Sequence, residues 1–144
     1  MVLKFYLAHP KFSMDKVREW QLKCELNTGV IFINPFFDNN SWEKTVNKGK
    51  QDRYDADAKP IIEADLKLIS KSDGVVAVVD GNFSYGTICE LVYAKIFYKP
   101  LYMVVTNGNA KHPWFRYHAT QIFTSFLDLE KHLKIISEKD NIEK

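Results

Sequence analysis

The stretch Gly74-Val75-Val76-Ala77-Val78-Val79-Asp80 decides the fold of this 144-residue chain. It is apolar until its last residue, and a helical pattern follows after a short loop. A strand that is apolar at every position is typical of a parallel sheet with both faces covered. The stretch therefore predicts a central strand of an α/β protein.

Strands and helical patterns alternate on both sides of this central strand. Strands are expected at residues 3–8, 30–34, 74–80, 101–105 and 121–124. Helices are expected at 13–26, from just after 53 to 72, at 86–98 and at 125–136, with a long loop at 35–51. Such alternation implies right-handed βαβ units. We expect one three-layer α/β sandwich over residues 1–136, with a five-stranded, mostly parallel sheet of the flavodoxin or Rossmann kind, and a frayed polar tail at 137–144.

Composition and charge narrow the class of protein. Twenty Lys and Arg against 18 Asp and Glu leave a net charge of +2, which gives no electrostatic case for binding nucleic acid or a membrane surface. No apolar run is long enough to span a bilayer, and no signal peptide is recognisable. Cys24 and Cys89 fit neither a zinc site nor a disulfide framework. We expect a reduced, cytoplasmic protein without metal or cofactor.

In open parallel sheets, ligands bind beyond the carboxyl ends of the strands. The segments to inspect are therefore 8–13, 34–38, 80–90 and the residues from 106 onward. They contain no GxGxxG, GxxxxGK[ST], HExxH or GxSxG motif, and the missing glycine fingerprint argues against a dinucleotide-dependent oxidoreductase.

Three side chains near these strand ends could carry chemistry. Glu90 is expected in the first turn of the helix after the central strand, where it either acts as an ionised nucleophile or only complements the helix dipole. Asp65 shares a helical stripe with Ile61 and Leu68, so it is either buried and used or solvated at an edge. The buried hydroxyl of Tyr6 needs a partner, and a strand-end carboxylate is a candidate.

Two further aspartates admit more than one interpretation. Asp73 directly precedes the central strand, and we expect it to cap or turn the chain. Asp80 directly follows the strand, where it either forms a turn or contacts a ligand.

Several segments together resemble the nucleoside 2-deoxyribosyltransferase family, which includes related nucleotide N-glycosidases. The segments are Phe5-Tyr6-Leu7-Ala8-His9-Pro10, Asn34-Pro35-Phe36, Ile62-Glu63-Ala64-Asp65-Leu66 with Ser72-Asp73, and the run from Asp80 through Gly86-Thr87-Ile88-Cys89-Glu90-Leu91-Val92-Tyr93-Ala94. Their order and spacing over residues 3–105 carry the resemblance. No single segment decides it.

The resemblance implies a mechanism with two carboxylates. Glu90 would attack C1′ of the deoxyribose and form a covalent glycosyl-enzyme, which another base or water then resolves. Tyr6 would orient Glu90, and Asp65 would handle the proton on the departing and arriving base. This division of roles is that of a retaining glycosidase, and it needs no cofactor.

The resemblance also implies a set of substrate-binding residues. They are Ala8, His9, Phe12, Pro35, Phe36, Asp80, Ser84, Gly86 and Thr87. Ser84 departs from the transferases, which usually carry an aspartate six residues before the nucleophile. A serine at this position is found in the 5′-monophosphate hydrolases, where it contacts phosphate.

A second cue favours the transferases. The loop after the first strand, residues 9–13, has one lysine and no arginine, and it resembles their apolar loop, in which an aromatic residue such as Phe12 stacks on the base. We therefore expect a transferase, with a 2′-deoxynucleoside 5′-monophosphate N-glycosidase as the alternative. Phe36, Phe37 and Trp42 are either packed or able to close over the base.

The family usually completes its site with a residue from a neighbouring subunit. The resemblance thus implies a homodimer or higher homo-oligomer, with Thr120 and Gln121 as the candidates for that residue. The alternative to an enzyme is a non-catalytic nucleotide-binding module. Loss of turnover in Glu90→Ala with the fold retained would favour the enzyme.

Overall fold

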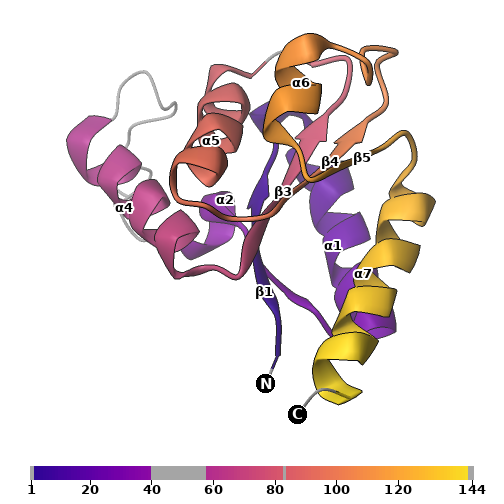
Figure 1. The fold of residues 1–144 in the computed structure, drawn as a ribbon. Helices are drawn as coiled ribbons and strands as arrows, with labels where there is room; N and C mark the ends of the chain where they lie inside the picture. Colours follow the sequence, from indigo (N-terminus) through magenta and orange to yellow (C-terminus); the bar gives the residue numbers. More distant parts are fainter. Residues whose placement is uncertain (1, 40–57, 83, 143–144) are drawn as a thin grey trace.

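A five-stranded sheet forms the centre of the computed structural model, which describes residues 2–39, 58–82 and 84–142 (Figure 1). The strands are β1 (Lys4–Ala8), β2 (Ile31–Ile33), β3 (Gly74–Val79), β4 (Leu101–Val105) and β5 (Gln121–Phe123). They lie in the order β2-β1-β3-β4-β5, and every neighbouring pair is parallel. This strand order is that of flavodoxin-like folds, so the expected fold class is confirmed.

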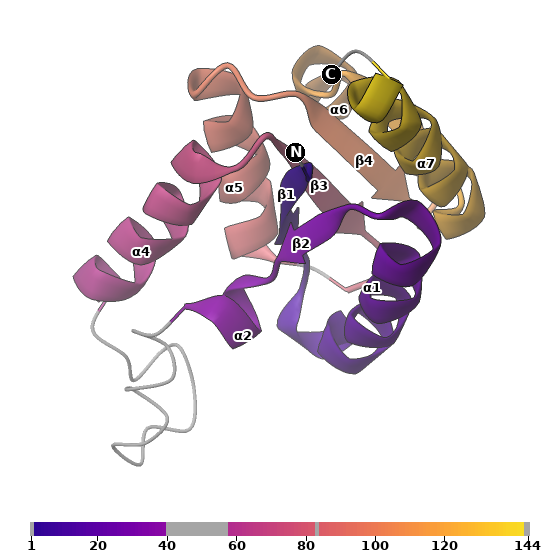
Figure 2. The same cartoon turned by 90° about the horizontal axis from the view of Figure 1, so that it is seen from below.

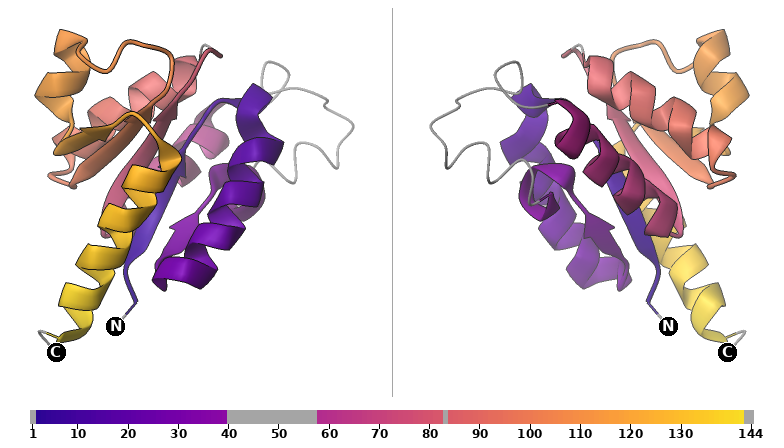
Figure 3. Two further views of the ribbon diagram at one scale, coloured as in Figure 1. Left: turned by 90° about the vertical axis from the view of Figure 1, so that its right-hand side faces the viewer. Right: turned by 90° about the vertical axis from the view of Figure 1, so that its left-hand side faces the viewer.

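Helices cover both faces of the sheet and make the three layers. They are η1 (Lys11–Ser13), α1 (Met14–Thr28), α2 (Pro35–Asp38), α4 (Ala58–Lys71), α5 (Tyr85–Ile96), α6 (Pro113–His118) and α7 (Phe126–Ile142). Helices α1 and α7 lie on one face, and α4 and α5 lie on the other (Figures 2 and 3). None of the described helices is long and apolar enough to cross a membrane.

The side chains of each strand alternate between two cores. Leu7, Val76 and Val78 pack with α1 and α7, whereas Tyr6 and Ala77 pack with α4 and α5. Strand β3 is buried at every position because it lies between two strands and under helices on both sides. Its uninterrupted apolar sequence is thereby explained.

Two glycines are required by local geometry. Gly29 ends α1 with φ +81°, the left-handed cap expected from the sequence, and its N–H donates to the carbonyl of Glu25 at 3.0 Å. At Gly74, a Cβ atom would lie 2.8 Å from the ring of Phe5 and 3.0 Å from the carbonyl oxygen of Pro100. The close approach of β1 to the start of β3 therefore depends on a residue without a side chain.

A reciprocal pair of hydrogen bonds fastens the amino end of the sheet. The backbone N–H of Lys4 donates to the Asp73 carboxylate at 2.8 Å, and the backbone N–H of Asp73 donates to the Lys4 carbonyl at 2.8 Å. Asp73 thus turns the chain into β3, as expected.

The helices depart from the expectations at several points. Helix α2 occupies the start of the predicted loop 35–51, because Asn34 caps it by accepting from the Phe36 N–H at 3.2 Å and Pro35 suits its first position. Helix α6 was not expected. Helix α7 continues to Ile142 instead of ending at residue 136, and Ser137 is buried in it. Residues 40–51 of that loop, Trp42 among them, lie outside the described residues.

Candidate active site

Tyr6 and Glu90 meet in the core between β1 and α5. Tyr6 is fully buried and Glu90 is 9% exposed. The Tyr6 hydroxyl donates a hydrogen bond to the Glu90 carboxylate. The structure thus supplies the carboxylate partner that the buried hydroxyl needs.

Glu90 was predicted from the sequence in the first turn of its helix. In the structure Glu90 lies beyond the first turn of α5. The helix begins at Tyr85 and has no acidic residue in its first turn. Ser84 is the N-cap, and its Oγ accepts from the Thr87 N–H at 3.1 Å and from the Thr87 hydroxyl at 3.0 Å. Because the helix dipole acts mainly within the first turn, the dipole argument for Glu90 was wrong. The hydrogen bond that Tyr6 donates favours the ionised form of this carboxylate.

Asp65 is a second buried carboxylate, on α4 with 3% of its surface exposed. The side-chain amide of Asn39 donates to Asp65 Oδ1 at 2.7 Å and to the Ile61 carbonyl oxygen at 3.1 Å. The alternative of a solvated edge position is therefore wrong. The inward stripe of α4 includes Ile69, which is fully buried, and Leu68 packs half-buried against the same core.

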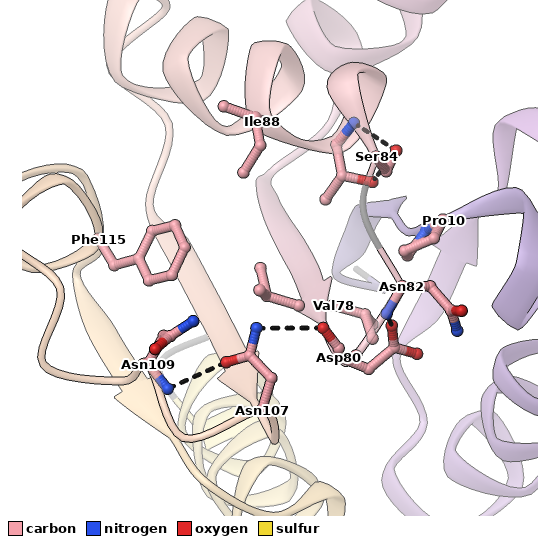
Figure 4. A pocket seen from close by; sticks show the side chains of 12 residues that line it. Pro10, Val78, Asp80, Asn82, Ser84, Ile88, Asn107, Asn109 and Phe115 are labelled. Carbon is pink, nitrogen blue, oxygen red and sulfur yellow. Dashed lines mark hydrogen bonds between the residues drawn. The ribbon is translucent and has the colours of Figure 1, made fainter.

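A pocket of about 250 Å³ opens beyond the carboxyl ends of β3 and β4 (Figure 4). Its lining residues are Pro10, Val78, Val79, Asp80, Gly81, Asn82, Ser84, Thr87, Ile88, Asn107, Asn109 and Phe115. Thr87 lines this pocket and lies one helical turn before Glu90 on the inward side of α5. The pocket is thus adjacent to the Glu90 turn.

Asp80 ties three loops together at the mouth of this pocket, and Figure 4 shows its contacts with Asn82 and Asn107. Its Oδ1 accepts from the Asn82 N–H at 2.8 Å, and its Oδ2 accepts from the Ser13 hydroxyl. Its backbone carbonyl accepts from the Asn107 side chain at 3.1 Å. Asp80 therefore forms the turn after β3 and also holds the loops after β1 and β4. Ser13 precedes α1 without capping it by its side chain, because the hydroxyl is directed to Asp80.

Residues 5–136 match the family described as nucleoside 2-deoxyribosyltransferase. The chain belongs to this family.

The two structures described next are among the solved structures that share its fold. A 2-deoxyribosyltransferase from Bacillus psychrosaccharolyticus has a TM-score of 0.64 at 19% identity, over 88% of this chain and 90% of that one. The CMP N-glycosidase BcmB from Clostridium botulinum has a TM-score of 0.61 at 14% identity, over 92% of this chain and 98% of that one. At these identities the likeness shows the fold alone. A search of the curated proteins gives no match.

The predicted substrate-binding residues lie in different surroundings. Asp80, Ser84 and Thr87 line the pocket, and Gly86 lies half-buried between the latter two. Outside this set, Phe12 is 86% exposed, whereas Ala8 and Pro35 are buried.

His9 is buried and holds α2 against the end of β1. Its Nε2 lies 3.0 Å from Asn34 Oδ1, and its ring lies 4.9 Å from that of Phe36. These contacts place His9 and Phe36 side by side, and neither is among the described lining residues of the pocket.

Several lining residues were not identified individually from the sequence. Asn107, Asn109 and Phe115 follow β4, a segment that was flagged only by its position after a strand. The sequence Asn107-Gly108-Asn109 is typical of a turn and was the available signal. In the structure Asn107 Oδ1 accepts from the Asn109 N–H at 3.0 Å, which closes that turn.

The described lining combines apolar and polar residues and is nearly uncharged. Among the described lining residues, Asp80 is the charged one, and none is Lys, Arg or His. Within residues 2–39, 58–82 and 84–142, no cluster of three or more His, Cys, Asp or Glu side chains could hold a metal ion.

Proposed function

We propose that this protein is a nucleoside 2′-deoxyribosyltransferase of the cytoplasm. It cleaves the N-glycosidic bond of a 2′-deoxynucleoside and transfers the sugar to another nucleobase. The observation that carries the proposal is the buried Glu90 carboxylate held by the Tyr6 hydroxyl, in a chain that belongs to this family. Asp65 provides the second buried carboxylate that the reaction needs.

The reaction proceeds in two displacements. A Glu90 carboxylate oxygen attacks C1′, the bond from C1′ to the base nitrogen breaks, and its electron pair leaves with the base. Asp65 donates a proton to the departing base. An incoming base then attacks C1′ and gives its proton to Asp65, and Glu90 is released as a carboxylate. Tyr6 donates to Glu90 and fixes the direction of attack.

The strand order supports one orientation of the substrate in this proposal. Helix α2 and Asn39 follow β2, on one side of Tyr6, whereas the pocket lies at the ends of β3 and β4, on the other. A sugar with C1′ at Glu90 and its base toward Asp65 therefore directs its 5′ end into the pocket. Asp80 is the charged residue of the described lining, and no cation accompanies it there. A 5′-phosphate in the pocket would therefore be repelled by Asp80, whereas a neutral 5′-hydroxyl would not.

One observation favours a second candidate, the 5′-monophosphate N-glycosidase. The Ser84 oxygen already accepts two hydrogen bonds from Thr87, which leaves its own hydroxyl hydrogen to donate. It lies at the N-terminus of α5, where backbone N–H groups attract anions. A phosphate at Ser84 would then have to outweigh the repulsion from Asp80.

A product assay by chromatography separates these candidates. One reaction contains deoxyinosine and free adenine, and the other contains 2′-deoxynucleoside 5′-monophosphates. Deoxyadenosine in the first establishes the transferase. Free base released only from the monophosphates establishes the hydrolase. No turnover in either, with ligand binding intact, would establish a binding module instead.

We also propose a homo-oligomer that shares its active sites, with Gln121 as the donated residue. The other candidate is engaged within its own chain, because Thr120 Oγ1 accepts from the Leu101 N–H at 3.0 Å. Gln121 is exposed at the start of β5. Sedimentation analysis, followed by an assay of Glu90→Ala mixed with Gln121→Ala, tests this. Recovered activity in the mixture supports shared sites, and a monomeric active enzyme contradicts them.

A further inference from the structure

Asn39 is a buried polar residue that the reaction above does not use. It directly follows α2 and is 3% exposed. Its side-chain nitrogen donates to the Ile61 carbonyl oxygen at 3.1 Å and to Asp65 Oδ1 at 2.7 Å. Both hydrogens of the amide are therefore directed at α4.

The orientation of this amide follows from its partners. A backbone carbonyl only accepts hydrogen bonds, so the nitrogen of Asn39, and not its oxygen, must face Ile61. The same nitrogen then donates to Asp65. Because Ile61 and Asp65 are one turn apart on α4, Asn39 links the carboxylate to the backbone of its own helix.

Asn39 is itself held by the short helix before it. Its backbone N–H donates to the Pro35 carbonyl at 3.2 Å. At the other end of α2, the Asn34 side chain donates to Gln21 Oε1 at 3.1 Å and lies 3.0 Å from His9 Nε2. Helix α2 is thus anchored to α1 and β1, and Asn39 meets Asp65 from a fixed base.

We propose that Asn39 is a positioning residue for Asp65, which rests on the proposed function of Asp65 as the acid and base. Its amide directs the carboxylate and stabilises its ionised form, since a hydrogen bond donated to a carboxylate favours the charged state. It thereby sets the pH range over which Asp65 exchanges its proton with the base.

The test compares pH–rate profiles of kcat for the wild type, Asn39→Ala, Asn39→Asp and Asp65→Asn. Asn39→Ala should lower kcat by on the order of tenfold to 100-fold, with little change in KM, because misdirected catalytic groups lose rate rather than binding. The limb of the profile that Asp65→Asn abolishes should move to higher pH in Asn39→Ala. It should move further in Asn39→Asp, where a like charge faces the carboxylate.

Ser72→Ala is the matched control, since it removes a buried hydrogen bond from the same helix. The Ser72 hydroxyl donates to the Ile69 carbonyl at 2.7 Å at the far end of α4. It should lower stability and leave the profile in place. Should Asn39→Ala fail to fold, Asn39→Ser keeps a donor, and it should retain the profile limb nearer to that of the wild type than Asn39→Asp does.

Two results would overturn the proposal at different levels. An Asn39→Ala enzyme with the kcat and profile of the wild type, alongside an Asp65→Asn enzyme whose kcat is strongly lowered and whose profile lacks that limb, would remove the positioning role and leave the mechanism standing. Full activity in Asp65→Asn would remove the acid–base role of Asp65, and the role of Asn39 with it.

Discussion

The hydroxyl of Tyr6 on β1 donates a hydrogen bond to the carboxylate of Glu90 on α5, and 84 positions separate the two in the sequence. The bond joins the sheet to the helix in a region from which water is nearly excluded. A donor in such surroundings favours the ionised carboxylate and restricts its rotation. The contributions of Glu90 and Tyr6 can therefore be tested separately.

Replacing the Glu90 carboxylate should abolish turnover. Glu90→Gln keeps the shape of the side chain but removes the nucleophile, so we expect kcat to fall by roughly 10⁴-fold or more. The measurement is product formation from a deoxynucleoside, with circular dichroism to verify the fold. A Glu90→Gln enzyme that keeps most of its rate would refute the covalent mechanism.

Removing only the Tyr6 hydroxyl should have a smaller effect. A hydrogen bond to a charged group contributes about 1.5–3 kcal/mol, so kcat/KM of Tyr6→Phe should fall by on the order of tenfold to 100-fold. Tyr102→Phe is the matched control, because Tyr102 packs against the core on the other face of the sheet. Equal losses in both variants would mean that the effect on Tyr6 is one of packing.

Loss of the Asp80 carboxylate should loosen the loops around the pocket. Asp80→Ala removes the acceptors for the Asn82 N–H and the Ser13 hydroxyl, and we expect a loss of about 1–3 kcal/mol in the free energy of unfolding. Asp80→Asn keeps an oxygen for Asn82 and presents a donor to the Ser13 oxygen, so its loss should be smaller. Urea denaturation measures the loss in both variants. Midpoints equal to that of the wild type would show that the carboxylate does not hold these loops.

Stability should decrease in alkaline solution through Cys24. Burial raises the pKa of this thiol from 9.0 to about 12, against an opposing hydrogen bond with Thr28 and with smaller raising contributions from Glu130 and Glu25. Above pH 9 the unfolded chain releases the proton while the folded chain keeps it, so the free energy of unfolding falls as the pH rises. Urea denaturation between pH 8 and 10 measures the slope.

Cys24→Ala provides the control for this slope. Burial also raises the pKa of Tyr102, so some alkaline dependence should remain in the variant. The part that disappears is the contribution of Cys24. Identical slopes in the wild type and in Cys24→Ala would show that this thiol titrates alike in both states.

Most of the sheet could be predicted from the sequence because its strands are short apolar runs. The limits of β4 were predicted as 101–105 and are Leu101–Val105. Helix α6 was missed because it is short and its N-cap is His112, which is not among the usual capping residues. The end of α7 was missed because the polar sequence after residue 136 gives no apolar stripe, although Ser137 is buried in the fold.

The site was predictable in its carboxylates but not in their partners. Asp65 could be placed on an inward face from its helical spacing with Ile61, and Tyr6 from its place in a strand. The contact of Asn39 with Asp65 crosses 26 positions and leaves no periodic pattern. Glu90 was misplaced because the start of its helix was predicted too late. Ser84 is the N-cap, and the first turn of α5 ends before Glu90.

The capping role of Ser84 has an evolutionary consequence. The family resemblance implies an aspartate at this position in transferases and a serine in monophosphate hydrolases, and both residues are strong helix N-caps. Either one can therefore begin α5 with nearly the same helix stability. Ancestral chains could exchange them, and with them the group that meets the substrate, without passing through a poorly folded intermediate.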